Sequence, residues 1–341
     1  MRILLSASQA PFLRGGAELH ADNLHAALLR AGHEVERIKL PFKFSPEADI
    51  EKLMAFCEGY DMAAPNGQTA DRMISLQFPG YGMAHPHHIG WVLHQHRAVY
   101  ELFDEAQATP ALRRLREAVT AFDKRVLTQL RRVFANSKRV AERMQQFNGV
   151  ASQPLYHPPP GAERLYCDEE WGYVFAPSRL ESLKRQDLLI EAARLLRCPL
   201  RILIGGTGGQ QERYAGLIEK YGLQDRVRLI GNFSEPERLA LYAHALGVVF
   251  VPRDEDLGYI TLEGMFAAKP VITCTDSGGP LEFVLPGQTG WVTEPTPEAL
   301  AEALEALWAD KARSRALGEA GRARIAGLGL SWDRVVETLC A

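Results

Sequence analysis

Short apolar runs alternate with longer amphipathic segments along the first hundred residues. The run RILLSAS at 2–8 leads through a glycine loop into a helical pattern over 17–30, and the run EVERIKL follows at 34–40. The apolar runs at 73–78 and 89–95 are also short, and runs of this length suit sheet interiors better than helices. This order of strand, helix and strand predicts a parallel sheet with connecting helices.

Between residues 110 and 143 the apolar period becomes helical. The positions that share this period are Leu112, Leu115, Val119, Phe122, Val126 and Leu130. They are surrounded by many arginines, which predicts a long amphipathic helix and, with it, a helical insertion near 110–131. The run VFANS at 133–137 returns to strand, and the proline-rich segment HPPPGAE at 157–163 predicts a linker between two domains.

A second series of strands and helices follows the linker. The expected strands are YVFAPSRL, RILIGGTGG, VRLIGNF, GVVFVPR and PVITC, which begin at residues 173, 201, 227, 247 and 270. Helical patterns over 300–308 and 332–339 close the chain. A chain of 341 residues with 46% hydrophobic content can fill two cores. We therefore expect an α/β protein with domains at 1–160 and 161–325 and a last helical segment at 326–341.

Charge and cysteine content exclude several classes of function. A net charge of −3 gives no overall positive field, so nucleic acid is not an expected partner. The five cysteines are far apart and form no C-x-x-C pair, which indicates reduced thiols rather than a zinc or redox site. No apolar run approaches the ~18 residues that span a bilayer, and the start of the chain lacks a signal-peptide pattern, so we expect a cytoplasmic location.

Two cations follow the first strand of the second domain. In SRLESLKRQDLLIEAA, Arg179 stands at the strand end and Lys184 in the short loop before an apolar-periodic helix. Doubly wound sheets bind ligands outside the carboxyl ends of their strands, and Arg and Lys at that edge suit phosphate. The segment taken alone supports an anion site and a pair of solvated loop charges about equally.

Two carboxylates flank a predicted helix start in DEDLGYITLEGMFAAKPVITC. Glu255 lies in a loop and Glu263 on the following helix, and the segment 258–261 between them places a helix N-terminus that favours a phosphate group. Carboxylates beside it can accept hydrogen bonds from sugar hydroxyls. Two alternatives stay open for this segment: ordinary acidic loop residues, or metal binding by Asp254 and Asp256.

Glycines follow several of the predicted strands. They are Gly15 and Gly16, the run at 205–209, and Gly278 with Gly279, where turns or close approach to a ligand explain them equally well. None completes the dinucleotide-binding fingerprint, and a phosphate-loop motif is missing. NAD enzymes and P-loop kinases are therefore poor candidates.

Together these motifs resemble family 4 of the retaining glycosyltransferases over nearly the whole chain. The resemblance lies in four segments. They are GGAELHADNLHAALLRAGHEV at 15–35, SRLESLKRQDLLIEAA at 178–193, the segment 255–292, which ends in GQTGWV, and the terminal SWDRVVETLC at 331–340. It implies the GT-B fold, in which two Rossmann-like domains with parallel sheets face each other across a cleft. The last helix would cross back onto the first domain.

The resemblance also assigns roles by position. Arg179 and Lys184 would hold the donor diphosphate, Glu263 would bind the nucleotide ribose and Glu255 would face the donor sugar. The backbone amides implied to meet the diphosphate belong to Gly15, Gly16, Gly258, Tyr259, Ile260 and Thr261. The base would contact backbone groups of Gly231, Asn232 and Phe233. One departure from the family pattern is Arg185, which stands where glycine usually follows the lysine.

A histidine closes the sugar pocket of the first domain in such enzymes. The candidates in one stretch are His85, His87, His88, His94 and His96. We favour His94, which follows the strand run, as a catalytic residue beside Arg179, Lys184 and Glu255, and Arg97 is a weaker alternative. A structural role for a histidine at a strand end stays open.

The implied reaction moves a sugar from a nucleoside diphosphate to an acceptor hydroxyl with retained anomeric configuration. It needs neither a metal nor a further cofactor. A sugar, a lipid-linked glycan or a small molecule would serve as acceptor in bacterial glycan, polysaccharide or glycolipid synthesis. The alternatives are a GT-B-shaped epimerase or phosphorylase and a non-catalytic sugar-binding protein.

The segment 111–143 is strongly basic within an acidic chain. It holds ten Lys or Arg and three Asp or Glu, a net +7, so the remaining residues sum to −10. Two interpretations stay open. The arginines form a solvated outer face of the amphipathic helix, or they attract an acidic acceptor or the anionic inner membrane, which would make the protein peripheral there.

Overall fold

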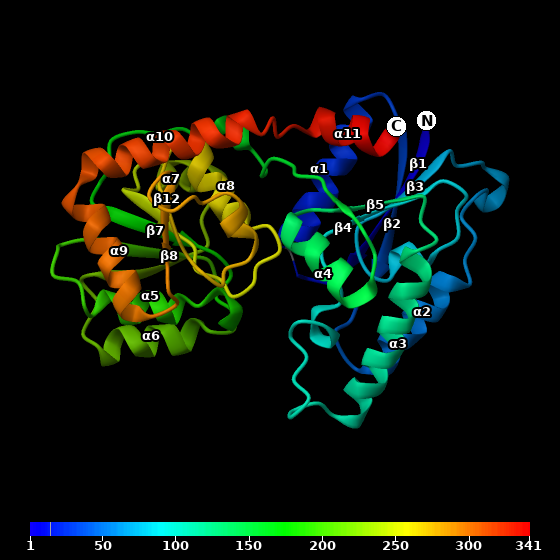
Figure 1. The fold of residues 1–341 in the computed structure, drawn as a ribbon, viewed down its shortest axis with the longest axis horizontal. Helices are drawn as coiled ribbons and strands as arrows, with labels where there is room; N and C mark the ends of the chain where they lie inside the picture. The colour runs from blue at the N-terminus through cyan, green and yellow to red at the C-terminus, as the bar shows by residue number, and fades with distance from the viewer. Residues whose placement is uncertain (14) are drawn as a thin grey trace. The chain divides into compact units, whose positions relative to one another are not determined.

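The described chain, residues 1–13 and 15–341 of a computed structural model, divides into two units. The first contains Met1–Pro160 and Ser331–Ala341, and the second contains Gly161–Leu330. Each unit has its own parallel six-stranded sheet, and the two are described separately (Figure 1). No described helix combines the length and the apolar composition that a membrane crossing requires.

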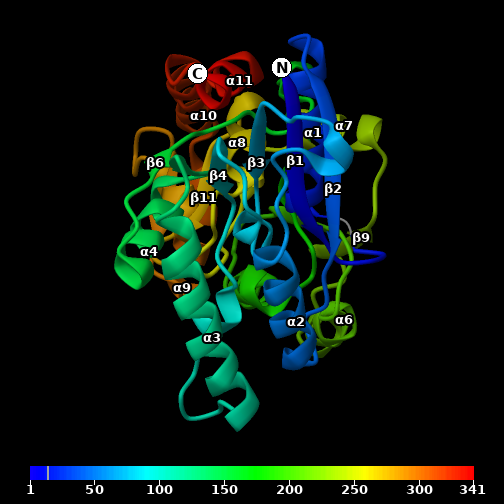
Figure 2. The ribbon, with the colours of Figure 1, turned by 90° about the vertical axis from the view of Figure 1, so that its right-hand side faces the viewer.

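The sheet of the first unit has the order β2-β1-β3-β4-β5-β6. Its strands are β1 (Arg2–Gln9), β2 (Glu34–Pro41), β3 (Arg72–Ser75), β4 (His88–Val92), β5 (Arg132–Ala135) and β6 (Gln153–Pro154). All pair in parallel, and Figure 2 shows β1 and β2 side by side. The predicted parallel sheet is confirmed, although the strands predicted at 73–78 and 89–95 end earlier, at Ser75 and Val92.

Helices cover both faces of this sheet. They are α1 (Gly16–Arg30), α2 (Glu47–Glu58), α3 (Pro110–Leu127), α4 (Lys138–Asn148) and α11 (Trp332–Cys340). One apolar cluster joins Leu24 and Leu28 of α1 to Val335 and Leu339 of α11, so the last helix packs on α1 as the family resemblance implied (Figure 1). A second cluster joins α2, α3 and α4 on the opposite face.

Helix α3 is shorter than the predicted amphipathic segment. It begins after the cap residue Thr109 and ends at Leu127, and β5 and α4 occupy the rest of the segment up to Arg143. Its predicted apolar face is confirmed. Leu115, Val119, Phe122 and Val126 are buried, and Leu112 and Leu130 pack against the same cluster.

The sheet of the second unit has the order β12-β11-β10-β7-β8-β9, again all parallel. Its strands are β7 (Tyr173–Pro177), β8 (Arg201–Gly205), β9 (Val227–Gly231), β10 (Gly247–Val249), β11 (Val271–Cys274) and β12 (Gly290–Thr293). The five predicted strands are confirmed as elements, but β7, β8, β9 and β10 end earlier than predicted, β10 at Val249 rather than Arg253.

Six α-helices surround this sheet. They are α5 (Gln186–Ala193), α6 (Gln211–Lys220), α7 (Glu235–Ala243), α8 (Tyr259–Phe266), α9 (Pro297–Ala309) and α10 (Lys311–Gly327). Helices α5, α6 and α9 share the main core of the unit, and α10 packs on α8. The short 3₁₀ helices of the chain are η1 (Pro65–Gly67), η2 (Gly80–Gly82), η3 (Arg97–Val99), η4 (Ala162–Arg164), η5 (Ser182–Lys184) and η6 (Gly279–Glu282).

Candidate functional site

The second sheet reverses its strand order at β7. From β7 the chain continues to β8 and β9 on one side, and then crosses to β10, β11 and β12 on the other. Such a reversal separates the loops that follow the two central strands, and ligands of doubly wound sheets bind there. The loop after β7 carries Arg179 and Lys184, and the loop after β10 carries Glu255.

The two predicted cations have different environments. Arg179 follows β7, is exposed and has no ion-pair partner within residues 1–13 and 15–341. The ammonium of Lys184 contacts the carboxylate of Glu255 and lies 5.5 Å from the centre of the Phe250 ring. Lys184 and Glu255 are 71 positions apart in the sequence, and their side chains are only 18% and 17% exposed. The structure therefore brings together two of the residues that the sequence predicted for one site.

The loop after β7 is held in place by two groups that the sequence analysis did not select. The buried Gln186, first residue of α5, donates from its side-chain amide to the carbonyl of Arg179 at 3.0 Å and also to Ser178. The Leu180 amide donates to the Thr207 carbonyl at 3.0 Å. These hydrogen bonds fix the backbone that presents the guanidinium of Arg179.

The glycine-rich runs bring backbone against backbone. A Cβ on Gly206, whose φ is +110°, would lie 2.1 Å from the carbonyl oxygen of Ser178, and one on Gly208 would lie 2.5 Å from that of Leu180. Likewise, a Cβ on Gly278 would lie 2.6 Å from the carbonyl oxygen of Glu255. Close packing on the site loops therefore explains why these positions need glycine.

Arg185 has the left-handed backbone conformation, with φ at 52°. This explains the glycine that the family usually has here, because glycine adopts this region without steric cost. The arginine side chain compensates with several contacts. It forms a two-pronged ion pair with Asp276, at 2.6 and 2.8 Å, and donates to the carbonyls of Val251 and Pro252 at 2.8 Å. It thereby ties the loop of Lys184 to the end of β10.

Helix α8 starts at the same edge of the sheet. Gly258 caps it in the left-handed conformation, and Tyr259, Ile260 and Thr261 form its first turn. The hydroxyl of Thr261 is buried and has no hydrogen-bond partner within the described residues. The predicted helix N-terminus between Glu255 and Glu263 is therefore confirmed as an element, while its role toward a phosphate remains a prediction.

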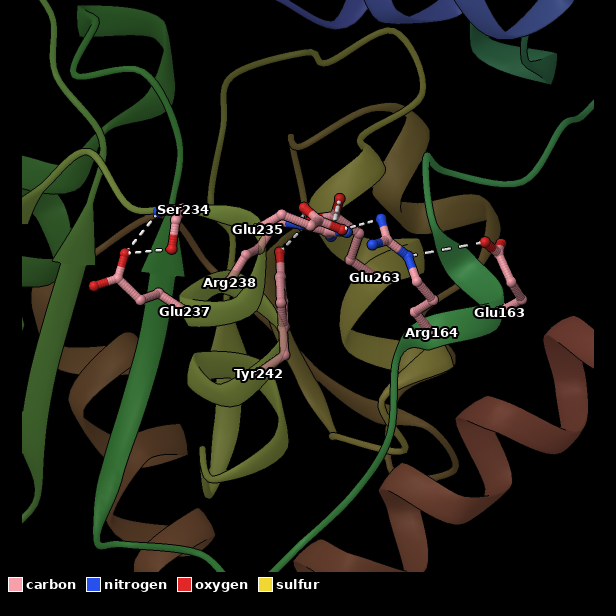
Figure 3. Close-up of polar contacts among 8 residues, drawn as sticks. All are labelled: Glu163, Arg164, Ser234, Glu235, Glu237, Arg238, Tyr242 and Glu263. Atoms are coloured by element: carbon pink, nitrogen blue, oxygen red, sulfur yellow. Dashed lines mark hydrogen bonds and ion pairs between the residues drawn. The ribbon is translucent and has the colours of Figure 1, made fainter. Parts of the chain in front are cut away.

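Glu263 lies one turn further along α8 inside a polar cluster (Figure 3). One carboxylate oxygen accepts from the guanidinium of Arg238 at 2.8 Å, and the other accepts from the hydroxyl of Tyr242 at 2.5 Å. Burial raises the pKa of Glu263, while the charge of Arg238 and the hydrogen bond from Tyr242 lower it. The cluster thus gives Glu263 a cation and a hydrogen-bond donor, which are the two features that stabilise an ionised carboxylate when it is largely withdrawn from water.

The segment predicted to contact a base follows β9. Gly231 has a φ of 68°, and its carbonyl accepts from the amide of Gly206 at 2.7 Å. Asn232 is exposed and accepts from the hydroxyl of Thr207 at 3.3 Å. The ring of Phe233 packs over Gly205, where a Cβ would lie 2.6 Å from it.

The first unit contains the remaining predicted residues. Gly15 caps α1, and its amide donates to Glu18 at 2.8 Å, so this amide is engaged within the cap. Gly16 is the first residue of α1. His94 is half-buried beyond β4, and its Nδ1 lies 2.8 Å from the carbonyl oxygen of Gln95.

The other histidines of that stretch have structural surroundings. His85 and His87 precede β4, and His88 is buried within it and hydrogen-bonds Ser75 at 2.7 Å. His96 is also buried, and burial lowers its pKa to about 4. The alternative candidate Arg97 forms an ion pair with Glu101 at 2.5 Å.

A second buried polar network lies in the first unit. Asp123 of α3 is 0% exposed and accepts from the hydroxyls of Tyr81 and Tyr100, both at 2.7 Å. Asn148 donates to Tyr100 at 2.9 Å and accepts from Gln95, which neighbours His94. Burial raises the pKa of Asp123 to about 7.

Asp254 and Asp256, the alternative metal ligands, are both half-buried in the loop after β10. In residues 1–13 and 15–341, no group of three or more His, Cys, Asp or Glu side chains is arranged to hold a metal ion. Asp254 has a φ of 49°, and its amide donates to the carbonyl of Asp276 at 2.9 Å.

The sequence reasoning missed Gln186, Arg238 and Tyr242. A signal existed for the last two, because Arg238 and Tyr242 are four positions apart and therefore share one face of a helix. That face could not be matched to Glu263 without the tertiary structure, since helices α7 and α8 are separated by a strand and a loop.

Comparison with known proteins shows which family and which solved structures the chain resembles. Residues 167–324 match the sequence model of the family described as Glycosyl transferases group 1. Alpha-1,3/1,6-mannosyltransferase ALG2 of Homo sapiens is 31% identical over 164 residues, which cover 43% of this chain and 39% of that protein.

Two solved structures are similar over nearly their full length. Sucrose-phosphate synthase (tll1590) from Thermosynechococcus elongatus has a TM-score of 0.81 at 20% identity, covering 99% of this chain and 97% of that one. Anabaena Alr3699/HepE in complex with UDP-glucose has a TM-score of 0.76 at 19% identity, covering 100% and 98%. The GT-B-like fold class is thereby confirmed. The chain spans only 25%, 39% and 26% of three curated relatives that it matches.

Proposed function

Because residues 167–324 match the group 1 glycosyl transferases, we propose that the chain belongs to this family and is a retaining glycosyltransferase. It moves a sugar from a nucleoside diphosphate to the hydroxyl of an acceptor. The supporting observation is the set of positive groups at the reversal point of the second sheet. Arg179, Lys184 and the first turn of α8 all lie at the carboxyl edge of β7 and β10.

The charges at this edge suit a diphosphate. Arg179 is exposed and has no ion-pair partner in the described chain, so its guanidinium is available to a ligand. Lys184 is already paired with Glu255. A diphosphate that binds here gains the attraction of Arg179 and of the N-terminal end of α8, and it shares Lys184 with Glu255.

Each carboxylate has a separate role in the proposal. Glu255 faces the donor sugar, beside the cation that holds the phosphate. Glu263 binds the ribose of the nucleotide, because its oxygens have lone pairs beyond those that Arg238 and Tyr242 use. The base contacts backbone groups of the segment 231–233, as the resemblance implies.

The proposal assigns Gly15, Gly16 and His94 on the same resemblance. Gly15 and Gly16 follow β1 at the start of α1, and His94 follows β4. All three therefore stand beyond carboxyl ends of strands in the first unit, which is where such sheets bind ligands. Use of the Gly15 amide by a phosphate would displace Glu18 from the cap.

The chemistry follows from where charge develops. When the bond between the sugar and the diphosphate breaks, negative charge grows on the departing oxygen. Arg179, Lys184 and the α8 amides stabilise this charge more in the transition state than in the ground state. The departing phosphate oxygen accepts the proton of the acceptor hydroxyl, so neither Glu255 nor Glu263 acts as a nucleophile and the carboxylate pair of glycoside hydrolases is not required.

Ligand-induced stabilisation tests the donor. Thermal unfolding is measured with UDP, GDP and ADP, and UDP is tried first because the solved HepE complex contains UDP-glucose. A ligand that binds only the folded protein raises the melting temperature. No shift with any of the three would contradict the proposal, and product analysis with the matching sugar nucleotide separates a transferase from an epimerase or phosphorylase.

We also propose that the basic segment is a solvated face, in a cytoplasmic protein. Arg113 and Arg125 form ion pairs with Glu105 and Glu58, and the buried Arg143 pairs with Glu101; these three carboxylates lie outside the segment. These acidic partners reduce the local excess of positive charge. Co-sedimentation with anionic vesicles at low salt tests the alternative. Binding that weakens as salt screens the charges would favour peripheral membrane contact.

A further inference from the structure

A chain of alternating charges leads through the second unit to Glu263 (Figure 3). The guanidinium of Arg164 pairs with Glu235 at 2.5 Å. Glu235 in turn binds Arg238 through both oxygens, at 2.7 and 2.8 Å, and Arg238 binds Glu263 at 2.8 Å. Glu235 and Arg238 each have a charged partner on both sides, and at the outer end Arg164 also lies 4.0 Å from Glu163.

Arg238 is enclosed by this arrangement. Its side chain is 13% exposed, as is that of Glu263, so both charges are largely withdrawn from water. Its fork spans two carboxylates that belong to different helices, Glu235 on α7 and Glu263 on α8. A planar guanidinium held at both sides has little freedom to rotate, which fixes the oxygen that it contacts.

Tyr242 fixes the second oxygen of the same carboxylate. Its ring is 0% exposed, and its hydroxyl donates to Glu263 at 2.5 Å. The burial of the ring leaves the hydroxyl no alternative orientation toward solvent. With one donor on each oxygen, the carboxylate plane of Glu263 is determined by two other side chains.

The outer end of the chain is more exposed, but it contacts the backbone that opens the unit. Gly161, the first residue of the second unit, has a φ of 66°, and a Cβ there would lie 2.8 Å from the guanidinium of Arg164 and 3.2 Å from Glu235. The pair of Arg164 and Glu235 therefore rests against the segment that opens the unit. This contact supports Glu235 and, through it, Arg238.

We propose that Arg238 and Tyr242 are positioning residues that orient the carboxylate of Glu263 toward the vicinal hydroxyls of a nucleotide ribose. The inference rests on the proposed function and deepens it. A carboxylate offers about four acceptor positions, of which two are used here, and the remaining two match the two hydroxyls of a ribose. A misoriented Glu263 would lose this match even when it stays charged.

A purely structural role makes a different prediction from a positioning role. If Arg238 only neutralises a buried carboxylate, its loss weakens all nucleotides to the same degree. If it orients Glu263, its loss removes the preference for a nucleotide with ribose hydroxyls over one without them. The ratio of the two dissociation constants is therefore the informative quantity.

The experiment is isothermal titration with UDP and with 2′,3′-dideoxy-UDP. If UDP does not bind, GDP or ADP is titrated instead, and each is compared with its own 2′,3′-dideoxy form. The variants are Arg238→Met, Arg238→Lys and Tyr242→Phe, with circular dichroism as a check of folding. Arg213→Met is the matched control, because it removes an ion pair of the same unit, with Asp187, outside this cluster.

We expect the wild type and Arg213→Met to prefer the ribose form by at least about tenfold, which corresponds to the loss of hydrogen bonds to a charged group. Arg238→Met should reduce this preference to about twofold or less, and Tyr242→Phe should reduce it partly. Arg238→Lys restores charge without the fork, so it should recover only part of the preference.

An unchanged preference in folded Arg238→Met, or an equal loss of affinity for both nucleotides, overturns the inference and leaves the proposed function intact. If Arg238→Met does not fold, Arg238→Lys and Tyr242→Phe decide the matter, and a wild-type ratio in both overturns the inference. A wild type that binds none of the nucleotides contradicts the proposed function itself.

Discussion

Two carboxylates of this protein are withdrawn from water, but they are balanced in different ways. Asp123 of the first unit is fully buried, accepts from two tyrosine hydroxyls and has no ion-pair partner in the described chain, and its pKa rises to about 7. Glu263 of the second unit accepts from one tyrosine hydroxyl and from Arg238. The side chain of Glu263 is 13% exposed.

The difference separates a structural carboxylate from a carboxylate suited to a ligand. Without a cation, the burial of Asp123 favours the protonated form, and the side chain serves the packing of α3. At the edge where α8 begins, burial raises the pKa of Glu263, and the charge of Arg238 offsets part of that rise; Lys184 contacts Glu255 in the same way. Burial alone therefore does not distinguish the carboxylates of the proposed site, whereas pairing with a cation at the carboxyl edge of the sheet does.

The largest effect should follow from removing the cations of the site. We expect Arg179→Ala and Lys184→Ala each to lower turnover by roughly a hundredfold, because both stabilise charge that develops in the transition state. Steady-state kinetics with the donor found by thermal shift would measure this. Arg228→Ala, an exposed arginine on β9, is the control. Wild-type turnover in both variants would contradict the proposed phosphate site.

The next effect distinguishes the two paired carboxylates. Glu263→Ala should weaken the binding of free nucleotide by about tenfold or more, since a hydrogen bond to a charged group is lost. Glu255→Ala should leave that affinity near the wild-type value and slow the transfer of the sugar instead. Isothermal titration and turnover measurements on both variants separate these outcomes, and equal losses of nucleotide affinity would show that the two roles are assigned wrongly.

Asp123 should affect stability rather than catalysis. Its pKa is raised from 3.8 to about 7, so between these values only the unfolded chain ionises, and unfolding releases a proton. The free energy of unfolding should therefore fall as the pH rises through this window and become flat above it. In Asp123→Asn this contribution is absent.

Urea unfolding at two pH values measures the contribution of Asp123. Between pH ~5 and ~7, the wild type should lose roughly 2 kcal/mol more than Asp123→Asn does. Asparagine has an oxygen and an amide that can still pair with the two tyrosine hydroxyls, so the variant should fold and keep its turnover. Parallel pH dependences in both proteins would mean that Asp123 is ionised in the folded state.

The smallest effect should come from a chelator. If cations of the chain balance the donor diphosphate, activity survives EDTA with no measurable loss. The control is an EDTA-treated sample supplied with manganese. Loss of activity that manganese restores would make Asp254 and Asp256 metal ligands and would remove the contrast between paired and unpaired carboxylates.

Local sequence signals predicted the parts of the site that depend on one strand and its loop. Arg179 and Lys184 were selected because both follow one buried run, and Glu255 was selected because it precedes a helix start. The cluster around Glu263 could not be found in this way. Arg238 meets Glu263 across 25 positions, and nothing in either helix alone indicates the other.

The glycines show why parts of the fold were missed as well. Helix α10 was not predicted, since Gly318 and Gly321 lower its helical propensity. In the structure a Cβ on Gly318 would lie 2.1 Å from the carbonyl oxygen of Ala268, so the glycine permits two backbones to meet. Asp123, by contrast, follows Val119 by four positions on the buried face of α3, a signal that the sequence did contain.

Helix α11 has a consequence for the order of events during synthesis. It packs on α1 with Val335 and Leu339 in the core of the first unit, yet it is translated after the whole second unit. Domains generally fold in the order in which they leave the ribosome. Here the surface of α1 that receives α11 stays open to water while Gly161–Leu330 is made, so the first unit to begin folding is the last to finish, and its unfinished apolar surface is available to chaperones in the meantime.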